Sequence, residues 1–199
     1  MFIILPRTLS NSLCRRWYRR SRYILHRQTT FKEPHTRISL VRIDDRAIHG
    51  QLITRWPKDL PCDRLVAILD AVPAPPLLSS VMKGAVSDTK VWLFDTATAI
   101  EKLPKVIASE KRYFVIGKSP LTLQRIEQAG ISLKNSNGKI NVGPMSARAN
   151  AIAIGPNQSV TKDEAAAFEW LTGQGHAIEF RLVPDASFYT WQDARQKLK

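Results

Sequence analysis

The sequence predicts an α/β protein with a doubly wound, mainly parallel sheet that has helices on both faces. Short apolar runs alternate with segments of helical spacing almost throughout residues 37–199. One of these runs, Arg64–Asp70, is nearly continuous in apolar residues, as expected for a strand buried on both faces. The chain of 199 residues has no internal repeat and no low-complexity segment, so one compact domain accounts for most of it.

The elements follow one another regularly after Thr36. We expect strands over residues 38–43, 64–70, 90–95, 112–117, 139–143, 149–155 and 177–183. We expect helices over residues 49–56, 77–86, 96–109, 121–129, 165–171 and 188–198. Pro57 should stop the first helix and Gly130 should close the fourth. Thr161 and Glu164 form a capping box that opens the fifth.

The positive charge of the chain is unevenly distributed. Of the formal net charge of +13, the first 36 residues carry +7, from eight basic residues and one acid. We therefore predict a basic extension over 1–36, disordered or not native because the start codon is set too early, and one domain over 37–199. A transit peptide, a nucleic-acid-binding arm and a membrane-surface helix remain alternatives for the extension.

The sequence does not support a metal site, a nucleotide cofactor site or a membrane-spanning segment. The two cysteines, Cys14 and Cys62, have no CxxC spacing, and the four histidines have no short ligand spacing, so we expect no metal. No glycine-rich nucleotide loop follows any strand, and we expect no cofactor. The two cysteines fit a reduced cytoplasmic compartment, and no apolar run approaches the roughly 18–20 residues of a membrane span.

The densest group of reactive side chains follows the first strand. Asp44, Asp45, Arg46 and His49 lie between this strand and the first helix, and Arg42 comes just before them. The N-terminus of a helix suits phosphate, and arginines add bidentate donors. A histidine there can accept a phosphoryl group on one ring nitrogen while an aspartate holds the other. Alternatively, the two acids merely cap the helix and the histidine is an ordinary solvated side chain.

The same loop resembles a known family. The string Ile38–Leu52, ISLVRIDDRAIHGQL, resembles the start of the IIB components of the mannose/fructose/sorbose family of the bacterial sugar phosphotransferase system. Lys139–Met145, KINVGPM, resembles the N-I/V-G-G/N-M loop of that family. The resemblance covers about residues 37–199, nearly the whole chain after the basic segment.

The resemblance implies a phosphocarrier domain, a protein-histidine:sugar phosphotransferase. His49 matches the histidine that takes a phosphoryl group on Nδ1 from a phosphohistidine of the IIA partner and passes it to a sugar imported by the membrane IIC and IID subunits. We expect phosphate-binding or supporting roles for Arg42, Asp45, Arg46, Gly50, Gln51, Asp70 and Gly143. Such a protein is cytoplasmic and peripheral to its membrane subunits; a homodimer is left open.

Three departures from the family pattern accompany the match. Ala71 replaces the second of two consecutive acids, Pro144 replaces the second glycine of a Gly-Gly pair, and the basic front has no counterpart. A regulatory relic of the same fold is therefore one alternative function. A basic protein associated with nucleic acid is another, although charge alone gives only non-specific attraction and we expect no specific nucleic-acid partner. The sequence does not indicate which sugar is transported.

Overall fold

The computed structural model describes residues 37–69 and 89–198. The basic extension, the helix expected over residues 77–86, and Asp70 and Ala71 lie outside the described residues. The division of the chain near residue 36 therefore stays a prediction.

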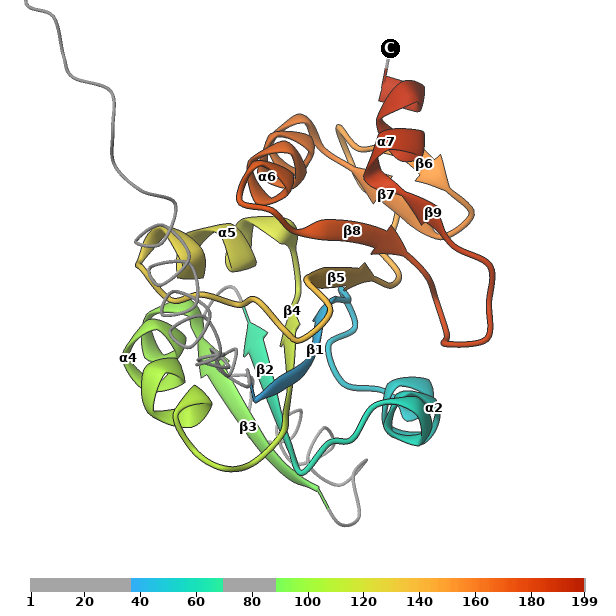
Figure 1. Cartoon of the computed structure of the whole chain (residues 1–199). Helices are drawn as coiled ribbons and strands as arrows, with labels where there is room; N and C mark the ends of the chain where they lie inside the picture. Colours follow the sequence, from blue (N-terminus) through green and yellow to red (C-terminus); the bar gives the residue numbers. More distant parts are fainter. Residues whose placement is uncertain (1–36, 70–88, 199) are drawn as a thin grey trace, which may run out of the picture. The chain divides into compact units, whose positions relative to one another are not determined.

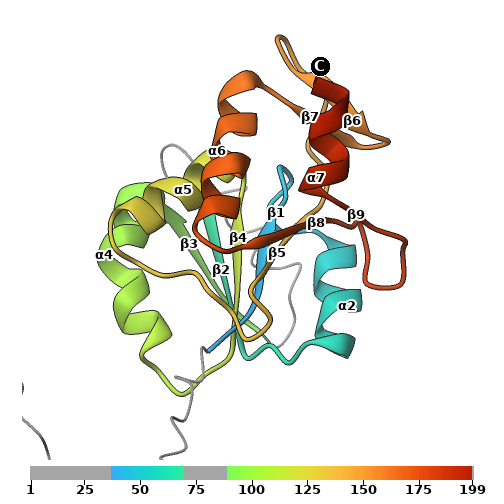
Figure 2. The same ribbon diagram turned by 45° about the horizontal axis from the view of Figure 1, so that its top comes forward.

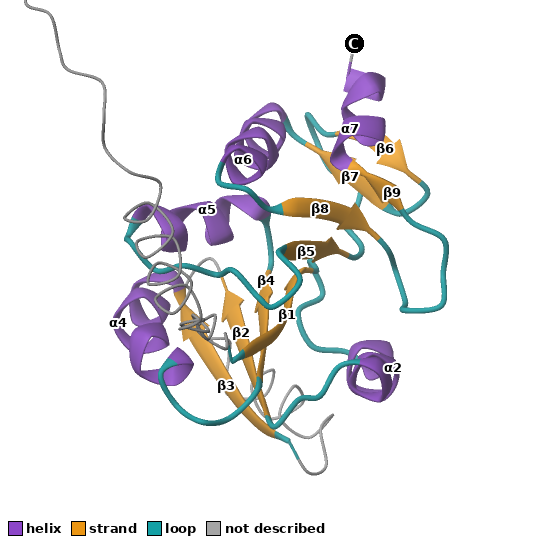
Figure 3. Cartoon of the chain, in the orientation of Figure 1, coloured by secondary structure: helices purple, strands orange, loops and turns teal. Residues whose placement is uncertain are grey.

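A seven-stranded sheet forms the centre of the fold, in the order β3-β2-β4-β1-β5-β8-β9 (Figures 1 and 3). The strands are β1 (Ile38–Ile43), β2 (Arg64–Leu69), β3 (Lys90–Asp95), β4 (Tyr113–Gly117), β5 (Lys139–Val142), β8 (Ala177–Phe180) and β9 (Tyr189–Thr190). All neighbours pair in parallel except β8 and β9, which pair antiparallel at one edge. The expected mainly parallel α/β fold is confirmed.

Helices lie against both faces of this sheet (Figures 1 and 2). The helices α4 (Thr96–Ile107), α5 (Pro120–Gln128) and α6 (Lys162–Gly173) share a core with side chains such as Val41 and Ile43 of β1. The helix α2 (Gly50–Asp59) packs through Leu52 and Trp56 against the opposite face, where Leu40 lies. Successive strand residues alternate between the two cores, because side chains along a strand point to opposite faces.

The end of α2 and the start of the last helix are among the boundaries that differ from expectation. Pro57 lies inside α2, which continues to Asp59, because a proline in the last turn removes only its own N–H donor and the Leu60 amide still bonds to the Trp56 carbonyl at 3.0 Å. The helix expected over 188–198 is wrong at its start. Tyr189–Thr190 form β9, since the Tyr189 ring stacks on Phe180 at 4.9 Å between ring centroids.

The C-terminal part contains a small second sheet that the sequence only half predicts. The strand β6 (Ile152–Gly155) pairs antiparallel with β7 (Gln158–Val160), which the sequence did not predict because it has only three residues. After β9 the chain forms α7 (Trp191–Ala194) and a 3₁₀ turn, η1 (Arg195–Leu198). Thr190 and Asp193 make the capping box that starts α7.

The strand order brings three loops together at the carboxyl edge of the sheet. The Asp44 amide, just after β1, donates to the Gly117 carbonyl at the end of β4 at 2.9 Å. On the other side of β1, the Gly143 amide donates to the Ile43 carbonyl at 2.8 Å. The loop after β1 thus lies between the ends of β4 and β5, where ligands collect in open α/β sheets. Within the described ranges, no helix has the length and apolar character to cross a bilayer.

Candidate functional site

A buried ion pair lies under the loop after β1. Arg42 and Asp44 are two residues apart, so they project to the same face of the strand and its extension. Both side chains have no exposed surface, and Asp44 Oδ2 accepts from Nε and Nη2 of Arg42 at 3.1 and 2.8 Å. Nη1 donates to the Asn141 side chain and to the Arg181 carbonyl, and Nη2 donates to the Leu182 carbonyl. All the donors of the guanidinium are therefore engaged within the protein.

The charges around this pair favour its ionised form, whereas burial opposes it. Burial lowers the pKa of Arg42, and the charge of Asp44 partly offsets this. Burial by itself would raise the pKa of Asp44, but the hydrogen bond with His49 and the charge of Arg42 outweigh it, and the pKa lies below its ordinary value. Asp44 is therefore a fixed anion beneath the loop.

His49 contacts this anion with one ring nitrogen. Its Nε2 lies 2.9 Å from Asp44 Oδ2, and the side chain is 15% exposed. An ionised carboxylate only accepts hydrogen bonds, so this contact favours the tautomer with the proton on Nε2. The lone pair of the neutral ring then belongs to Nδ1. The geometry therefore prepares Nδ1 as the nucleophile, as the family resemblance implies.

Arg46 supplies a partly exposed cation beside the ring. Its side chain is 49% exposed, and its Nε lies 3.6 Å from Asp44 Oδ1. Its Nη2 lies 3.2 Å from His49 Nε2, but it cannot donate to that nitrogen while Nε2 carries the proton. Unlike Arg42, Arg46 can turn its donors to an oxyanion at the surface.

The start of α2 adds backbone donors. His49 is the N-cap residue of α2 and makes no side-chain cap, and Gly50 and Gln51 are the exposed first residues of the helix. The amides of a first turn have no partner within the helix, so they can bind an anion. A Cβ at Gly50 would meet no atom within 4 Å, so the fold itself does not require glycine there.

The loop reaches this start through a strained residue. Ala47 is buried and has φ 57°, in the left-handed region that non-glycine residues rarely adopt. Its amide donates to the Asp44 carbonyl at 2.9 Å, which closes a tight turn from Asp44 to Ala47. This turn brings the histidine back over the carboxylate five residues earlier.

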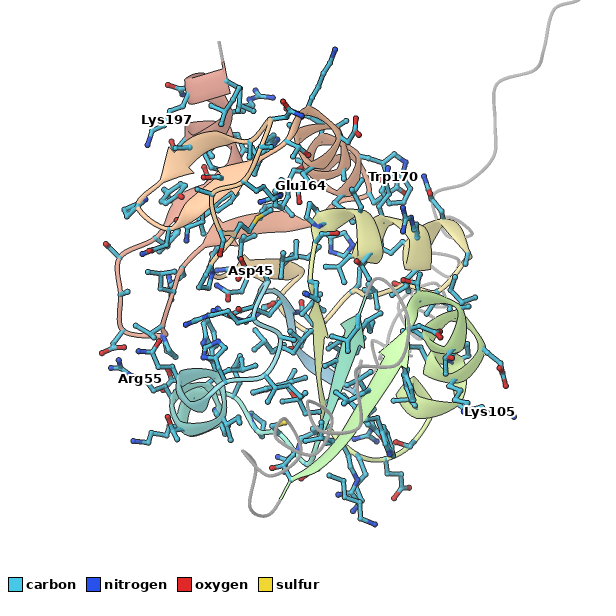
Figure 4. All side chains as sticks on the ribbon, turned by 180° about the vertical axis from the view of Figure 1, so that it is seen from behind. Asp45, Arg55, Lys105, Glu164, Trp170 and Lys197 are labelled. Atoms are coloured by element: carbon cyan, nitrogen blue, oxygen red, sulfur yellow. The ribbon has the colours of Figure 1, made fainter. Side chains whose placement is uncertain are left out.

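Asp45 points away from the histidine. Its Oδ2 accepts from the Ser146 amide at 2.7 Å, and its own amide donates to the Pro144 carbonyl at 3.2 Å. It therefore ties the loop after β1 to the loop after β5, and Asp44 takes the place beside the ring. Figure 4 shows Asp45 near the middle of the molecule, and a cavity of about 250 Å³ adjoins it, lined also by Lys118, Ser119, Met145, Ser146, Arg148 and Glu164.

Gly143 is packed against the buried ion pair. A Cβ built there would overlap the guanidinium of Arg42 and would lie 2.8 Å from Asp44 Oδ2. The residue is therefore glycine because the ion pair occupies the space of a side chain. Of the expected site residues, the structure gathers Arg42, Asp45, Arg46, His49, Gly50, Gln51 and Gly143 at this edge. It does not describe Asp70.

Two other reactive side chains are occupied elsewhere. His176 is 3% exposed, and its Nε2 lies 2.7 Å from Glu127 Oε1, which places it in a buried pair. Burial raises the pKa of the Cys62 thiol to about 11, so little thiolate is present at neutral pH. His49 is therefore the partly exposed histidine among the described residues.

Comparison with known proteins identifies relatives over nearly all of this domain. The model of the family "PTS system sorbose subfamily IIB component" matches residues 38–199. The fructose-specific EIIB component of Bacillus subtilis is 32% identical over 157 residues, which cover 75% of this chain and 91% of that protein. The mannose-specific EIIAB component of Escherichia coli K12 is 28% identical over 147 residues, 73% of this chain and 44% of that protein.

A solved structure has the same fold. The IIBSor domain of the sorbose permease from Klebsiella pneumoniae has a TM-score of 0.73 and 22% sequence identity, over 81% of this chain and 98% of that chain. At this identity the likeness concerns the arrangement of strands and helices.

Proposed function

Since the chain belongs to the sorbose-subfamily IIB components of the sugar phosphotransferase system, we propose that His49 is its phosphoryl carrier. Nδ1 of His49 would take the group from a phosphohistidine of a IIA partner and pass it to a sugar at the membrane IIC and IID subunits. The observation that carries the proposal is the 2.9 Å contact between His49 Nε2 and the buried Asp44.

The first transfer exchanges one N–P bond for another. The Nδ1 lone pair attacks phosphorus in line, and the departing imidazole of the partner keeps the electron pair of the broken bond. The accepting ring then carries phosphate on Nδ1 and hydrogen on Nε2, and so becomes cationic. Asp44 stabilises this cation as a buried carboxylate stabilises an imidazolium in other enzymes.

The phosphoryl oxygens need donors at the surface. Arg46 is half exposed beside the ring, and the N-cap residue of α2, His49, makes no side-chain cap to the first amides of the helix. Together they provide charge and N–H groups where negative charge moves during the transfer. Arg42 supports the site differently, since its donors hold Asp44 and the neighbouring carbonyls.

The second transfer would use a hydroxyl of the sugar. Its oxygen attacks phosphorus, the bond to Nδ1 breaks, and the ring recovers its lone pair while the hydroxyl proton leaves to a base. The fused EIIAB name of the Escherichia coli relative supports a IIA donor. We expect the carrier to act in the cytoplasm, peripheral to the membrane subunits.

Labelling with a phosphorylated IIA protein tests the proposal. The wild-type chain should gain one acid-labile, base-stable phosphate, which tandem mass spectrometry places on His49. His49→Ala should take no label, whereas the control His35→Ala should be labelled like the wild type. Phosphate on His176, or label that survives in His49→Ala, would contradict the proposal. A chain that takes no label would favour the regulatory relic instead.

A further inference from the structure

Gln158 of β7 is a buried polar residue that takes no direct part in the proposed transfer. Its side chain is 3% exposed, and it lies where β7 passes the loop after β5. Two backbone bonds join these segments, from the Met145 amide to the Asn157 carbonyl and from the Ser159 amide to the Met145 carbonyl, at 2.9 and 2.8 Å. The Gln158 amide group adds a third connection two residues earlier, at Gly143.

The orientation of this amide group is fixed by its partners. The Asn157 amide can only donate, and it donates to Gln158 Oε1 at 3.3 Å. The Gly143 carbonyl can only accept, and it accepts from Gln158 Nε2 at 3.2 Å. The Tyr189 hydroxyl donates to Oε1 at 3.0 Å, and burial raises the pKa of Tyr189 to about 12, so the hydroxyl keeps its proton. The oxygen and nitrogen of the amide are therefore not interchangeable.

Gly143 transmits this contact to the buried ion pair. Its amide is held by the Ile43 carbonyl and its carbonyl by Gln158, so both sides of the residue are anchored. The guanidinium of Arg42 occupies the space of its missing side chain, and Asp44 Oδ2 lies 2.8 Å from the same point. A shift of this backbone would move Arg42 or Asp44, because the packing leaves no intervening space.

We propose that Gln158 is a positioning residue for phosphoryl transfer. It holds the Gly143 backbone against the Arg42–Asp44 pair, and thereby keeps the Asp44 carboxylate hydrogen-bonded to Nε2 of His49. Gln158 acts through this backbone and touches neither the ring nor the phosphate. The proposal rests on the function proposed for His49, and it concerns the rate of transfer and the tautomer of the ring.

Two variants of Gln158 and one of Tyr189 distinguish the hydrogen bond from Gln158 to Gly143 from the other hydrogen bonds of the Gln158 side chain. Gln158→Glu keeps the acceptor for Asn157 and Tyr189 but places an oxygen against the Gly143 carbonyl. Gln158→Met keeps the length of the side chain and removes both the amide donor and the amide acceptor. Tyr189→Phe is the matched control, because it removes the hydroxyl and leaves the bond from Gln158 to Gly143.

The readouts are kcat and KM for phosphate transfer from phosphorylated IIA, and the ¹⁵N shifts of His49 in the unphosphorylated protein. Misplaced reacting groups cost up to about 100-fold in rate, so we expect both Gln158 variants to lower kcat about tenfold, with KM unchanged. The His49 shifts should move toward a mixture of tautomers, and the His176 signals should stay fixed. Tyr189→Phe should keep kcat within about twofold.

Two results would overturn the proposal. One is a kcat within about twofold of wild type in both Gln158 variants. The other is a lower kcat with unchanged His49 shifts, which would mean that Gln158 acts only through stability. If the wild-type chain accepts no phosphate, the function proposed for His49 fails instead, and the ¹⁵N shifts still test the positioning role.

Discussion

The imidazole of His49 and the carboxylate of Asp44 are joined at 2.9 Å through Nε2 and Oδ2, although only the histidine reaches the surface. Asp44 has no exposed side-chain area and shares the same oxygen with Arg42. The site therefore combines a fixed internal anion with a ring whose favoured tautomer has its lone pair on Nδ1. Stability and transfer should respond together when this anion is removed.

Asp44→Asn should lower both properties. The asparagine keeps the size of the side chain but leaves Arg42 as a buried cation without its anion, and breaking such a pair costs about 3–5 kcal/mol of unfolding free energy. Transfer should also fall, because the cationic phosphorylated ring loses its counter-charge. Urea unfolding measures the first effect and labelling by phosphorylated IIA the second. Asp63→Asn, which removes the more exposed ion pair with Arg112, is the control and should change the midpoint little.

Arg46 should matter for transfer and little for folding. Its side chain is 49% exposed, so neither Arg46→Lys nor Arg46→Ala leaves a buried group unpaired. Lysine keeps the charge but loses the planar fork, so we expect transfer to slow with lysine and to slow further with alanine. Arg55→Lys, in the exposed pair with Asp185, serves as control. Unchanged transfer rates in both Arg46 variants would show that this arginine does not assist transfer.

Gly143→Ala should be far more damaging than an alanine at an open glycine. The new methyl group would overlap the guanidinium of Arg42, and overpacking of this kind typically costs about 1–3 kcal/mol. Gly173→Ala, near the end of α6, adds a methyl group that meets no atom within 4 Å. It should be neutral or stabilising by up to about 1 kcal/mol. Equal melting temperatures for the two variants would contradict the packing seen at Gly143.

The buried pair of His176 and Glu127 predicts a dependence of stability on pH. Burial alone would raise the pKa of Glu127, but hydrogen bonds from His176 and from the Leu133 amide lower it below its ordinary value. A carboxyl with a depressed pKa in the folded state stabilises above its unfolded pKa of about 4.3, and this stabilisation is lost as the pH falls through the folded value.

Glu127→Gln should therefore be less stable than wild type at pH 7, and the two should converge as the pH is lowered toward 3. Unfolding free energies measured across this range check the effect. Glu101→Gln, on the exposed side of α4, is the control and should run parallel to wild type. A difference between Glu127→Gln and wild type that stays constant down to pH 3 would show that the charge of Glu127 does not stabilise the fold.

Much of the fold could be predicted because its strands are buried on both faces. Apolar runs such as Ile38–Ile43 and Tyr113–Gly117 lie between two cores, so their composition alone marks them. The edge is different. The strand β9 has two residues, and its position depends on pairing with β8 and on the stacking of Tyr189 on Phe180. Contacts between distant segments of this kind leave no local periodicity.

Seven of the expected site residues lie at one edge of the sheet, but the acid that contacts His49 was not predicted. Two neighbouring acids follow β1, and the sequence favoured Asp45 as the supporting one, whereas Asp44 meets the histidine. The strand alternation carries the missing signal, since Arg42 and Asp44 fall on one face and Asp45 on the other. The path of the chain back to His49 depends on the left-handed backbone of Ala47. An alanine in the sequence does not indicate this conformation.

Identifying the nitrogen that carries the phosphate tests the role of His49 most directly. ¹⁵N and ³¹P NMR of the chain after phosphorylation by IIA, with ¹⁵N-labelled histidine, identifies that nitrogen without any substitution. We expect phosphate on Nδ1 of His49, with the proton retained on Nε2 beside Asp44. Phosphate on Nε2 of His49, or on another histidine, would contradict it.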